Sequence, residues 1–213
     1  MTTKEKLLAL LEDSKGTFFS GEEIARTLQV SRAAVWKAVN ALREDGYTVD
    51  AATNKGYRLS PDLDILSPQG IRRFLKPEYR DLDLTVLPTA PSTNALVREK
   101  ANQGCPEGCI IIACEQTAGR GRYGRQFFSP VDSGVYLSLL LRPTAYSPQQ
   151  ATCLTAAAAA AMCQAIEEVT GQQPGIKWVN DIFLHGKKVC GILTEAAVGL
   201  ETGTLNYLSL IHI

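Results

Sequence analysis

Residues 115–125 read EQTAGRGRYGR, and this stretch decides the fold of the larger part of the chain. Gly119, Gly121 and Gly124 satisfy the spacing G-x-G-x-x-G, so a dinucleotide-binding fold has to be tested first. That fold requires a helix that opens at the glycines and an acidic residue about 20 positions further on. The residues that follow are QFFSP, which do not start a helix, so we reject this fold.

Arginines alternate with the glycines of this loop. Glycine backbone can wrap closely around a ligand while guanidinium groups point into it, which suits the anionic oxygens of phosphate and carboxylate. A disordered basic loop is the alternative, but the regular spacing and the apolar stretches on both sides favour a binding loop. We expect the loop to be mobile until a ligand orders it, because glycines and repelling arginines offer no packing of their own.

Segments of strand and helix character are mixed on both sides of the loop, and antiparallel hairpins come late in the chain, with a turn at His185-Gly186. This mixture predicts an α+β domain. The expected strands are residues 82–87, 109–115, 135–141, 176–178, 182–184 and 189–196, and the expected helices are residues 94–103 and 148–169.

Residues 1–60 have the pattern of three helices followed by a hairpin. Ser20 and Glu23 form an S-x-x-E capping box for the second helix, and Ser31 caps a third helix that ends at Gly46. Two short helices, a tight turn and a longer helix form the helix-turn-helix order, and the hairpin adds a wing. The expected helices are residues 4–12, 21–28 and 31–45, and the expected strands are residues 47–49 and 56–59.

The third helix has an apolar face and a polar face. Val35, Val39 and Leu42 recur at helical spacing and predict the buried side. The other side offers Arg and Lys for phosphate or guanine and Asn for adenine, although a merely solvated face is the alternative. Residues 1–60 hold nine Lys+Arg and eight Asp+Glu, so DNA binding would rest on a few contacts and on dimerisation. The candidate DNA-binding residues are Ser31, Arg32, Ala33, Trp36, Lys37 and Asn40.

A polar connector with Pro61 and Pro68 separates the two parts, and Ser67 caps a short helix within it. We place the boundary so that residues 1–62 form one domain and residues 63–213 the other.

Composition gives weaker constraints. Lys+Arg and Asp+Glu both number 22, so the chain as a whole indicates neither a nucleic acid nor a membrane partner. The polar N-terminus and the lack of a long apolar run predict no secretion signal or membrane span, and the six cysteines then indicate reduced thiols and a cytoplasmic location. Cys105, Cys109 and Cys114 lack a paired CxxC or a nearby histidine, so we expect no metal site there.

Two further segments complete a candidate site. Residues 92–94, Ser-Thr-Asn, place polar groups at a helix N-terminus, which by itself would be plain capping. Residues 177–181 precede a hairpin that brings Lys188 and Gly191 back beside Asp181. A lysine and a carboxylate there suit a phosphate site, or equally a surface salt bridge.

The motifs S-T-N, E-Q-T-x-G-R-G-R-x-G-R, K-W-x-N-D and K-x-x-G-I-L-x-E occur in this order. Together with the helix-turn-helix sequence SRAAVWK (residues 31–37), they resemble the bifunctional biotin ligase/biotin-operon repressor family over nearly all of residues 1–205. Val179 stands where the family usually has proline. The family continues into a glycine-asparagine strand motif and a small SH3-like domain. Residues 208–213 do not resemble that motif, so we expect a truncated or misassembled C-terminus.

The resemblance implies a winged helix-turn-helix domain and a class II synthetase-like α+β catalytic domain, incomplete at its C-terminus. It implies a biotin–[acetyl-CoA-carboxylase] ligase that makes biotinyl-5′-AMP from biotin and ATP with Mg²⁺, with no permanently bound cofactor. The biotinyl group then passes to a lysine of a biotin carboxyl carrier protein. It also implies a biotin-responsive repressor that binds operator DNA as a homodimer when adenylate is bound.

The same resemblance assigns roles by residue. The catalytic residues would be Lys188, Asp181 and Arg122, with Asp181 accepting the proton of the acceptor lysine or orienting that lysine. Biotin would contact Ser92, Thr93, Asn94, Gln116, Arg120, Gly121, Arg122, Lys188 and Gly191. The nucleotide would contact Gly119, Arg120, Arg122, Lys177, Asn180 and Lys188.

Two alternatives stay open. One is a non-enzymatic transcription regulator that senses a small anion, which the arginine loop and the Asp181–Lys188 pair disfavour. The other is a relative of the lipoate–protein ligases, for which neither this loop nor a winged helix is expected.

Overall fold

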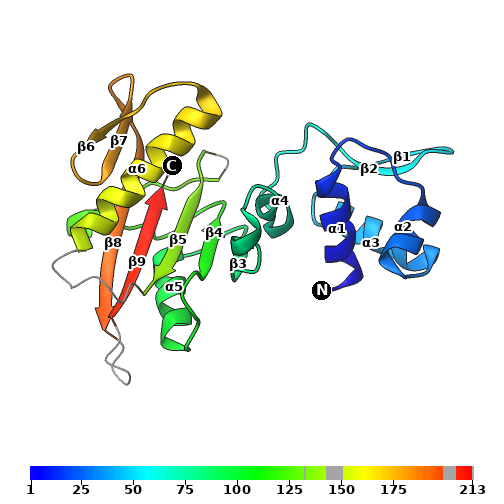
Figure 1. Cartoon of the computed structure of the whole chain (residues 1–213), viewed down its shortest axis with the longest axis horizontal. Coiled ribbons are helices and arrows are strands. Elements are labelled where there is room, and N and C mark those ends of the chain that lie inside the picture. Colours follow the sequence, from blue (N-terminus) through cyan, green and yellow to red (C-terminus); the bar gives the residue numbers. More distant parts are fainter. Residues whose placement is uncertain (132, 143–150, 199–204, 213) are drawn as a thin grey trace. The chain divides into compact units, whose positions relative to one another are not determined.

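The computed structural model describes residues 1–131, 133–142, 151–198 and 205–212 (Figure 1). The chain forms two compact units, Met1–Asp81 and Leu82–Ile213. Each unit has its own core and is described by itself.

The first unit is a helix-turn-helix with a β-hairpin wing, as expected. Its caps are local: Ser20 Oγ accepts from the Glu23 amide at 3.1 Å, and Ser31 Oγ accepts from the Ala34 amide at 3.2 Å. The core side chains are fully buried and include Leu7, Leu11, Ile24, Val35, Val39, Leu42 and Leu59. The elements are α1 (Thr3–Asp13), α2 (Gly21–Leu28), α3 (Arg32–Glu44), β1 (Val49–Ala52) and β2 (Gly56–Leu59).

The wing is fixed to the segment before α2. Phe19 and Tyr57 exchange two backbone hydrogen bonds, each 2.8 Å long. Gly56 has φ +96°, and a Cβ on it would lie 2.0 Å from the Phe19 carbonyl oxygen. Only glycine fits there, so the sequence Lys55-Gly56-Tyr57 sets the position of the wing.

The first unit ends later than the expected boundary at residues 62/63. The helix α4 (Pro68–Arg72) and the 3₁₀ helix η1 (Pro77–Tyr79) belong to it. The reason is contact with α1 and with the residues just after it. Arg73 Nη1 lies 3.4 Å from Oε2 of the buried Glu12 in α1, and Lys15, two residues beyond α1, donates to the Leu63 carbonyl.

The second unit is α+β, as expected, and contains a seven-stranded sheet in the order β3-β4-β5-β9-β8-β7-β6. Only β3 and β4 are parallel, and the other neighbours are antiparallel. No helix of the described residues is long and apolar enough to cross a membrane. The strands are β3 (Leu84–Leu87), β4 (Ile110–Ala113), β5 (Tyr136–Leu141), β6 (Gly175–Lys177), β7 (Asp181–Leu184), β8 (Lys187–Val198) and β9 (Leu205–His212). The helices are α5 (Thr93–Asn102), η2 (Arg122–Gly124) and α6 (Ala151–Thr170), and the start of α6, expected at residue 148, lies outside the described residues.

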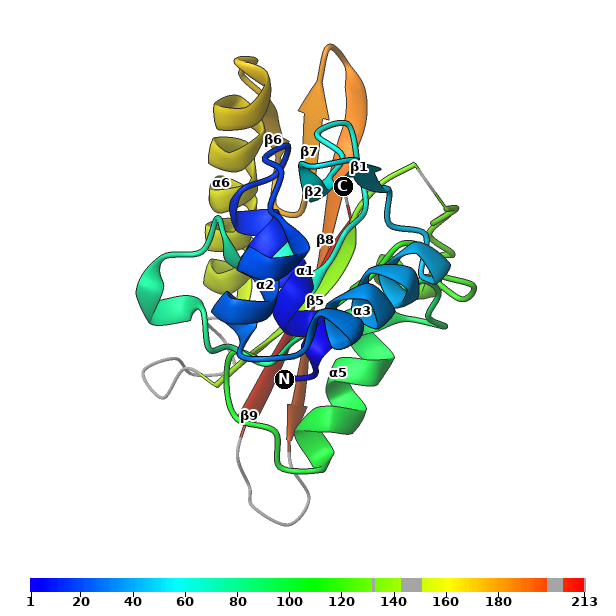
Figure 2. The same cartoon turned by 90° about the vertical axis from the view of Figure 1, so that its right-hand side faces the viewer.

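The two long helices of this unit cover opposite faces of the sheet (Figure 1, Figure 2). Leu140 of β5 packs with Val97 and Ala101 of α5, whereas Leu137 packs with the cluster around Ala159 of α6. Successive side chains of a strand point to opposite faces of the sheet, so residues two apart share a face. Ser138 therefore faces α5, together with Leu140.

The C-terminal strand lies beyond the last strand expected from the sequence, residues 189–196. Residues 208–213 do not resemble the strand motif of the family, yet Leu205–His212 forms β9 in the middle of the sheet (Figure 1). Tyr136 of β5 and Gly191 of β8 both pair with His212. β9 joins the β3-β4-β5 half of the sheet to the β8-β7-β6 half.

Candidate functional site

A buried polar network lies where α5 begins. The Thr93 side chain is fully buried, and Gln116 Oε1 accepts from both the Thr93 amide (2.9 Å) and Thr93 Oγ1 (3.2 Å). Thr93 Oγ1 also lies 2.7 Å from Ser138 Oγ, and Gln116 Nε2 donates to Ser129 Oγ at 3.2 Å. This network fixes the first turn of α5 against the strands beneath it.

Asn94 is also buried, and the nitrogen and the oxygen of its side-chain amide differ in their partners. Its Nδ2 donates to Glu195 Oε2 at 2.6 Å, and the same oxygen accepts from Arg98 Nη2 at 2.9 Å. Asn94 Oδ1 has no hydrogen-bond partner among the described residues. A buried amide oxygen without a partner costs free energy, so it points to a ligand that donates an N–H group there.

The glycine-arginine loop closes on itself. Gly119 O accepts from the Phe127 amide at 2.9 Å and Gly121 N donates to Arg125 O at 2.7 Å, which makes the loop a short hairpin. A Cβ on Gly119 would lie 2.7 Å from both Phe127 O and Ser129 Oγ, so the sequence requires glycine there. The premise that the loop has no packing of its own was therefore wrong; its ordering by a ligand stays a prediction.

Arg122 connects this loop to the β6–β7 turn. Its Nη1 donates to Asn180 Oδ1 at 3.1 Å, and its guanidinium carbon lies 5.2 Å from the centroid of the Tyr123 ring. Arg120, by contrast, has an exposed side chain and pairs with Gln126 through the backbone.

Lys188 and Asp181 form an ion pair across the β7–β8 hairpin. Lys188 Nζ lies 2.8 Å from Asp181 Oδ1, which also accepts from Asn180 Nδ2 at 2.9 Å. Gly191 is opposite Asp181 in the strand register, and a Cβ on Gly191 would lie 3.0 Å from Lys188 Nζ. Gly191 thus leaves room for the lysine side chain.

Phe127 packs over this pair. Its ring centroid is 5.7 Å from Lys188 Nζ, and a Cβ on Gly191 would lie 3.3 Å from its Cε2 atom. The hollow next to it is about 30 Å³, and the neighbouring one beside Arg122 and Asn180 is about 150 Å³. Ligand pockets are typically about 300–1,000 Å³, so a nucleotide needs more room than either of these two hollows offers. The smaller hollow is lined by Arg120, Gly121, Arg122, Phe127, Asn180, Lys188, Gly191, Ile192 and Leu193.

The predicted residues therefore fall into two neighbouring groups. Ser92, Thr93, Asn94 and Gln116 form the buried polar group, and Gly119 lies beside Gln116 Nε2. The cationic group holds Arg120, Gly121, Arg122, Asn180, Asp181, Lys188 and Gly191. Lys177 stands apart: it is exposed on β6, and its Nζ lies 5.5 Å from the Phe183 ring centroid.

Sequence reasoning missed four residues of the site: Phe127, Ser129, Ser138 and Glu195. Ser138 carried a signal, because it is the only polar residue of the strand YLSLLL. Glu195 is the last residue of the motif K-x-x-G-I-L-x-E, but its contact with Asn94 spans 101 positions and gives no local signal.

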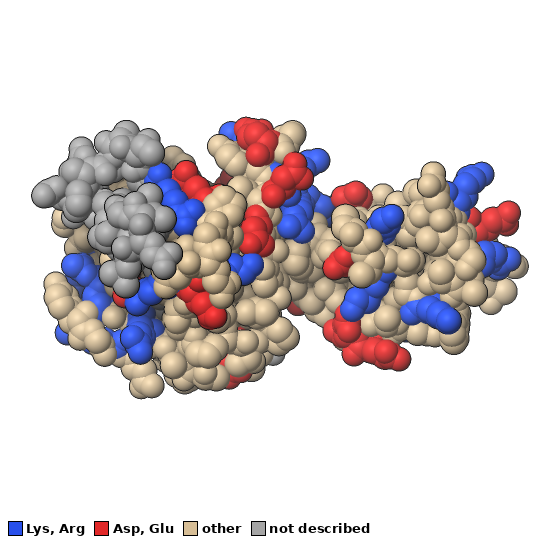
Figure 3. Space-filling view, turned by 90° about the horizontal axis from the view of Figure 1, so that it is seen from below, with Lys and Arg blue, Asp and Glu red and all other residues tan. Residues whose placement is uncertain are grey.

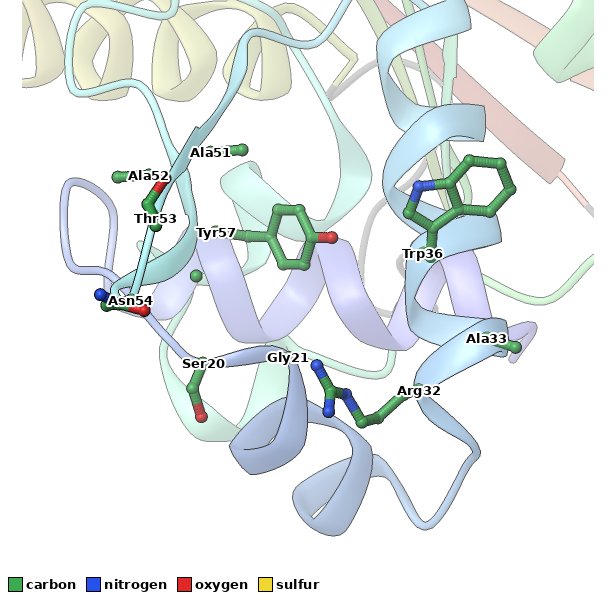
Figure 4. Close-up of a pocket in the computed structure, with 11 residues that line it drawn as sticks. Ser20, Gly21, Arg32, Ala33, Trp36, Ala51, Ala52, Thr53, Asn54 and Tyr57 are labelled. Atoms are coloured by element: carbon green, nitrogen blue, oxygen red, sulfur yellow. The ribbon is translucent and has the colours of Figure 1, made fainter.

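The first unit has a groove between α3 and the wing, with a volume of about 700 Å³ (Figure 4). Arg32, Ala33 and Trp36 line it from α3, and Tyr57 and Asn54 line it from the wing. The Trp36 side chain is exposed, as are Lys37 and Arg32. Ser20 and Gly21 close the groove at the start of α2.

The other candidate DNA residues lie outside this groove. Ser31 caps α3, and Lys37 and Asn40 follow along the same helix. Two further cations of this unit have internal partners: Arg43 donates to the Val49 carbonyl, and Arg58 pairs with Asp50 at 2.8 Å. On the face of this unit that Figure 3 shows, acidic and basic side chains are interspersed, which agrees with the near-neutral charge of the unit.

Family models match both units of the chain. Residues 3–58 match the model described as HTH domain, and residues 86–210 match the biotin/lipoate A/B protein ligase family. The second match covers more than half of the chain and nearly the whole of the second unit.

Curated relatives agree with both matches. The bifunctional ligase/repressor BirA of Bacillus subtilis is 44% identical over 194 residues, which are 91% of this chain and 59% of the relative. BirA of Escherichia coli is 34% identical over 91% of this chain and 58% of its own length. The chain thus spans about three fifths of the length of these relatives.

A solved structure is similar to the second unit in fold. The biotin protein ligase of Aquifex aeolicus, in complex with biotin and ATP, superposes with a TM-score of 0.50 at 30% identity. The superposition covers 62% of this chain and 51% of that protein. The chain joins a helix-turn-helix unit to a unit that matches the biotin/lipoate A/B protein ligase family, and it belongs to that family.

Proposed function

We propose that this chain acts as a biotin–[acetyl-CoA-carboxylase] ligase and as a biotin-responsive repressor. The observation that carries the choice of biotin is the unpartnered Oδ1 of buried Asn94. The ureido ring of biotin presents two N–H donors and one carbonyl acceptor, and one of these donors satisfies Asn94 Oδ1. The dithiolane ring of lipoate has no N–H group to offer.

The first step joins two anions. An oxygen of the biotin carboxylate bonds to the α-phosphorus of ATP, and the bond to pyrophosphate breaks, which gives biotinyl-5′-adenylate. Arg120, Arg122 and Lys188 reduce the repulsion and stabilise the charge on phosphorus, while Gly119 lets the backbone approach the phosphates. Asn180 and Lys177 contact the nucleotide. Mg²⁺ is expected to enter with the ATP phosphates.

The second step transfers the biotinyl group. The amine of the acceptor lysine on a biotin carboxyl carrier protein attacks the carbonyl carbon, and AMP leaves. Asp181 takes the proton of that amine or orients it. Asp181 is held by Lys188 and Asn180, so movement of Lys188 to the phosphate frees the carboxylate for this role.

The first unit supplies the repressor activity. The groove of Arg32, Ala33, Trp36 and Tyr57, with Lys37 and Asn40 further along α3, is proposed to take operator DNA. One unit with a net charge of +1 makes few phosphate contacts, so binding should require a homodimer, which the adenylate promotes. The curated relatives are named bifunctional ligase/repressor, which supports the proposal that ligase and repressor activities occur in one chain. We also propose a cytoplasmic location.

Exchange of labelled pyrophosphate into ATP tests this proposal. We expect exchange that depends on biotin and is not supported by lipoate. A non-enzymatic sensor would show no exchange with either acid, and a lipoate ligase would show exchange with lipoate alone. Gel shifts with palindromic operator DNA should show binding that rises when biotin and ATP are both added; tight binding by a monomer without ligand would contradict the repressor model.

A further inference from the structure

A second cluster of reactive side chains lies away from the ligase site. Asp83, Cys105 and Cys109 place three ligand atoms within 4.8 Å of one another. Cys105 Sγ lies 3.4 Å and Cys109 Sγ lies 3.8 Å from the same oxygen, Asp83 Oδ2. Lys100 Nζ is 2.8 Å from that oxygen as well.

We propose that Asp83, Cys105 and Cys109 bind one Zn²⁺ ion. The cysteine spacing does not predict a metal site, because Cys105, Cys109 and Cys114 have neither a CxxC pair nor a nearby histidine. In the fold, the group that joins Cys105 and Cys109 is not Cys114 but the carboxylate of Asp83, which is 22 positions before Cys105 in the chain. Two thiolates and a carboxylate are ligands that zinc takes in proteins, with water as a fourth.

The distances agree with a tetrahedral ion. Zinc–sulfur bonds of about 2.3 Å and zinc–oxygen bonds of about 2.0–2.2 Å at tetrahedral angles separate sulfur from oxygen by about 3.5 Å. The two sulfur–oxygen separations in the cluster are 3.4 and 3.8 Å. The ligand atoms thus need only small movements to coordinate a common ion.

The charges also balance. Without metal, Asp83 and Lys100 form an ion pair in the cluster. With zinc, two thiolates and the carboxylate carry three negative charges, and the ion with Lys100 carries three positive charges. Lys100 therefore serves as the counter-charge in both states.

The position of the cluster indicates a structural role. Cys105 follows α5, Asp83 precedes β3 and Cys109 precedes β4, so an ion would tie the C-terminal end of the helix to two strands. The polar group around Asn94 is at the other end of α5, about 15 Å away for a ten-residue helix. The ion is thus expected to stabilise the second unit without touching the reacting atoms.

Titration of the fully reduced protein with Co²⁺ tests the proposal, because thiolate ligands give Co²⁺ a charge-transfer band in the near ultraviolet. We expect saturation at one Co²⁺ per chain, displacement by Zn²⁺ and none by Mg²⁺, since thiolates select the softer ion. Zn²⁺ should also raise the melting temperature and slow the alkylation of Cys105. No band at millimolar Co²⁺, or alkylation of Cys105 that Zn²⁺ leaves unchanged, overturns the proposal.

Single variants identify the ligands. Cys105→Ser and Cys109→Ser should each lose the band, and Asp83→Asn should weaken Co²⁺ binding by about tenfold or more. Cys114→Ser and Cys153→Ser are the matched controls and should keep the band, because those thiols are outside the cluster. A band that persists in the Cys105→Ser/Cys109→Ser double variant contradicts the assignment. Circular dichroism confirms that each variant is folded.

Discussion

Lys188 Nζ lies 2.8 Å from Asp181 Oδ1 across the β7–β8 hairpin, and Gly191 and Phe127 bound the lysine on two sides. Each partner has its own proposed task, Lys188 toward phosphate and Asp181 toward the acceptor amine. Their pairing holds both side chains in place before substrates arrive.

Lys188→Ala should lower the rate of biotin-dependent pyrophosphate exchange by about 10²–10³-fold. One charge-assisted contact to a developing charge is worth about 2.7–4 kcal/mol at comparable sites. Lys187→Ala is the matched control, because Lys187 is the adjacent exposed lysine on the same strand. Near-normal exchange in Lys188→Ala, or an equal loss in both variants, would count against the role of Lys188.

Asn94→Ala should raise the KM for biotin by about tenfold to a hundredfold, since a buried hydrogen bond to the ureido ring costs about 1–3 kcal/mol to lose. Glu195→Ala should also raise the KM for biotin, because it removes the group that positions Asn94. Glu195→Gln keeps an acceptor oxygen and should raise the KM less. Arg98→Ala removes the other partner of Glu195 and is the control. An unchanged KM in Asn94→Ala would exclude the proposed contact.

Biotin and ATP together should slow tryptic cleavage within residues 120–125. The loop hairpin already has hydrogen bonds of its own, but its arginines are exposed, and a bound adenylate should pair with them and cover the loop. Cleavage after Lys55 in the wing is the internal control. Equal cleavage rates in the loop with and without both substrates would speak against the binding site.

Arg32→Ala and Lys37→Ala should each weaken operator binding and reduce the dependence of log Kd on log salt by about one unit. Both should leave pyrophosphate exchange intact, because the two activities are in separate units. Lys6→Ala removes the same charge from α1, outside the groove, and is the control. If Lys6→Ala weakened binding as much, the effect would be one of net charge and the groove assignment would fail.

The second unit should lose stability in alkali through Cys190. Burial raises the pKa of this thiol to about 12. A thiol with a raised pKa in the folded state contributes stability that is fully present below its unfolded value, near 8.5, and is lost as the pH rises toward 12. The loss is at most about 1.4 kcal/mol per pH unit. In EDTA, Cys190→Ala should flatten the fall in urea midpoint above pH 9, while Cys153→Ala should not; an unchanged slope in Cys190→Ala would contradict this.

Local signals predicted the first unit well. Ser20 and Ser31 cap their helices through contacts three residues away, and such contacts can be read from spacing alone. The loop and the Asp181–Lys188 hairpin were also predictable, because turn chemistry and strand pairing over a few residues bring them together.

Long-range contacts could not be predicted. The Asn94–Glu195 hydrogen bond and the central strand β9 depend on pairing between distant segments, and nothing in the local sequence specifies either. The later domain boundary has the same cause, since it follows from the contact of Arg73 with Glu12.

The central claim is that this chain forms biotinyl-5′-adenylate. Mass spectrometry of the purified protein after incubation with biotin, ATP and Mg²⁺ tests it most directly. The account predicts that biotinyl-5′-adenylate is recovered from the wild-type chain and is strongly reduced in Lys188→Ala. Recovery of unmodified biotin alone from a folded wild-type chain would contradict the ligase assignment and favour a biotin sensor without enzymatic activity.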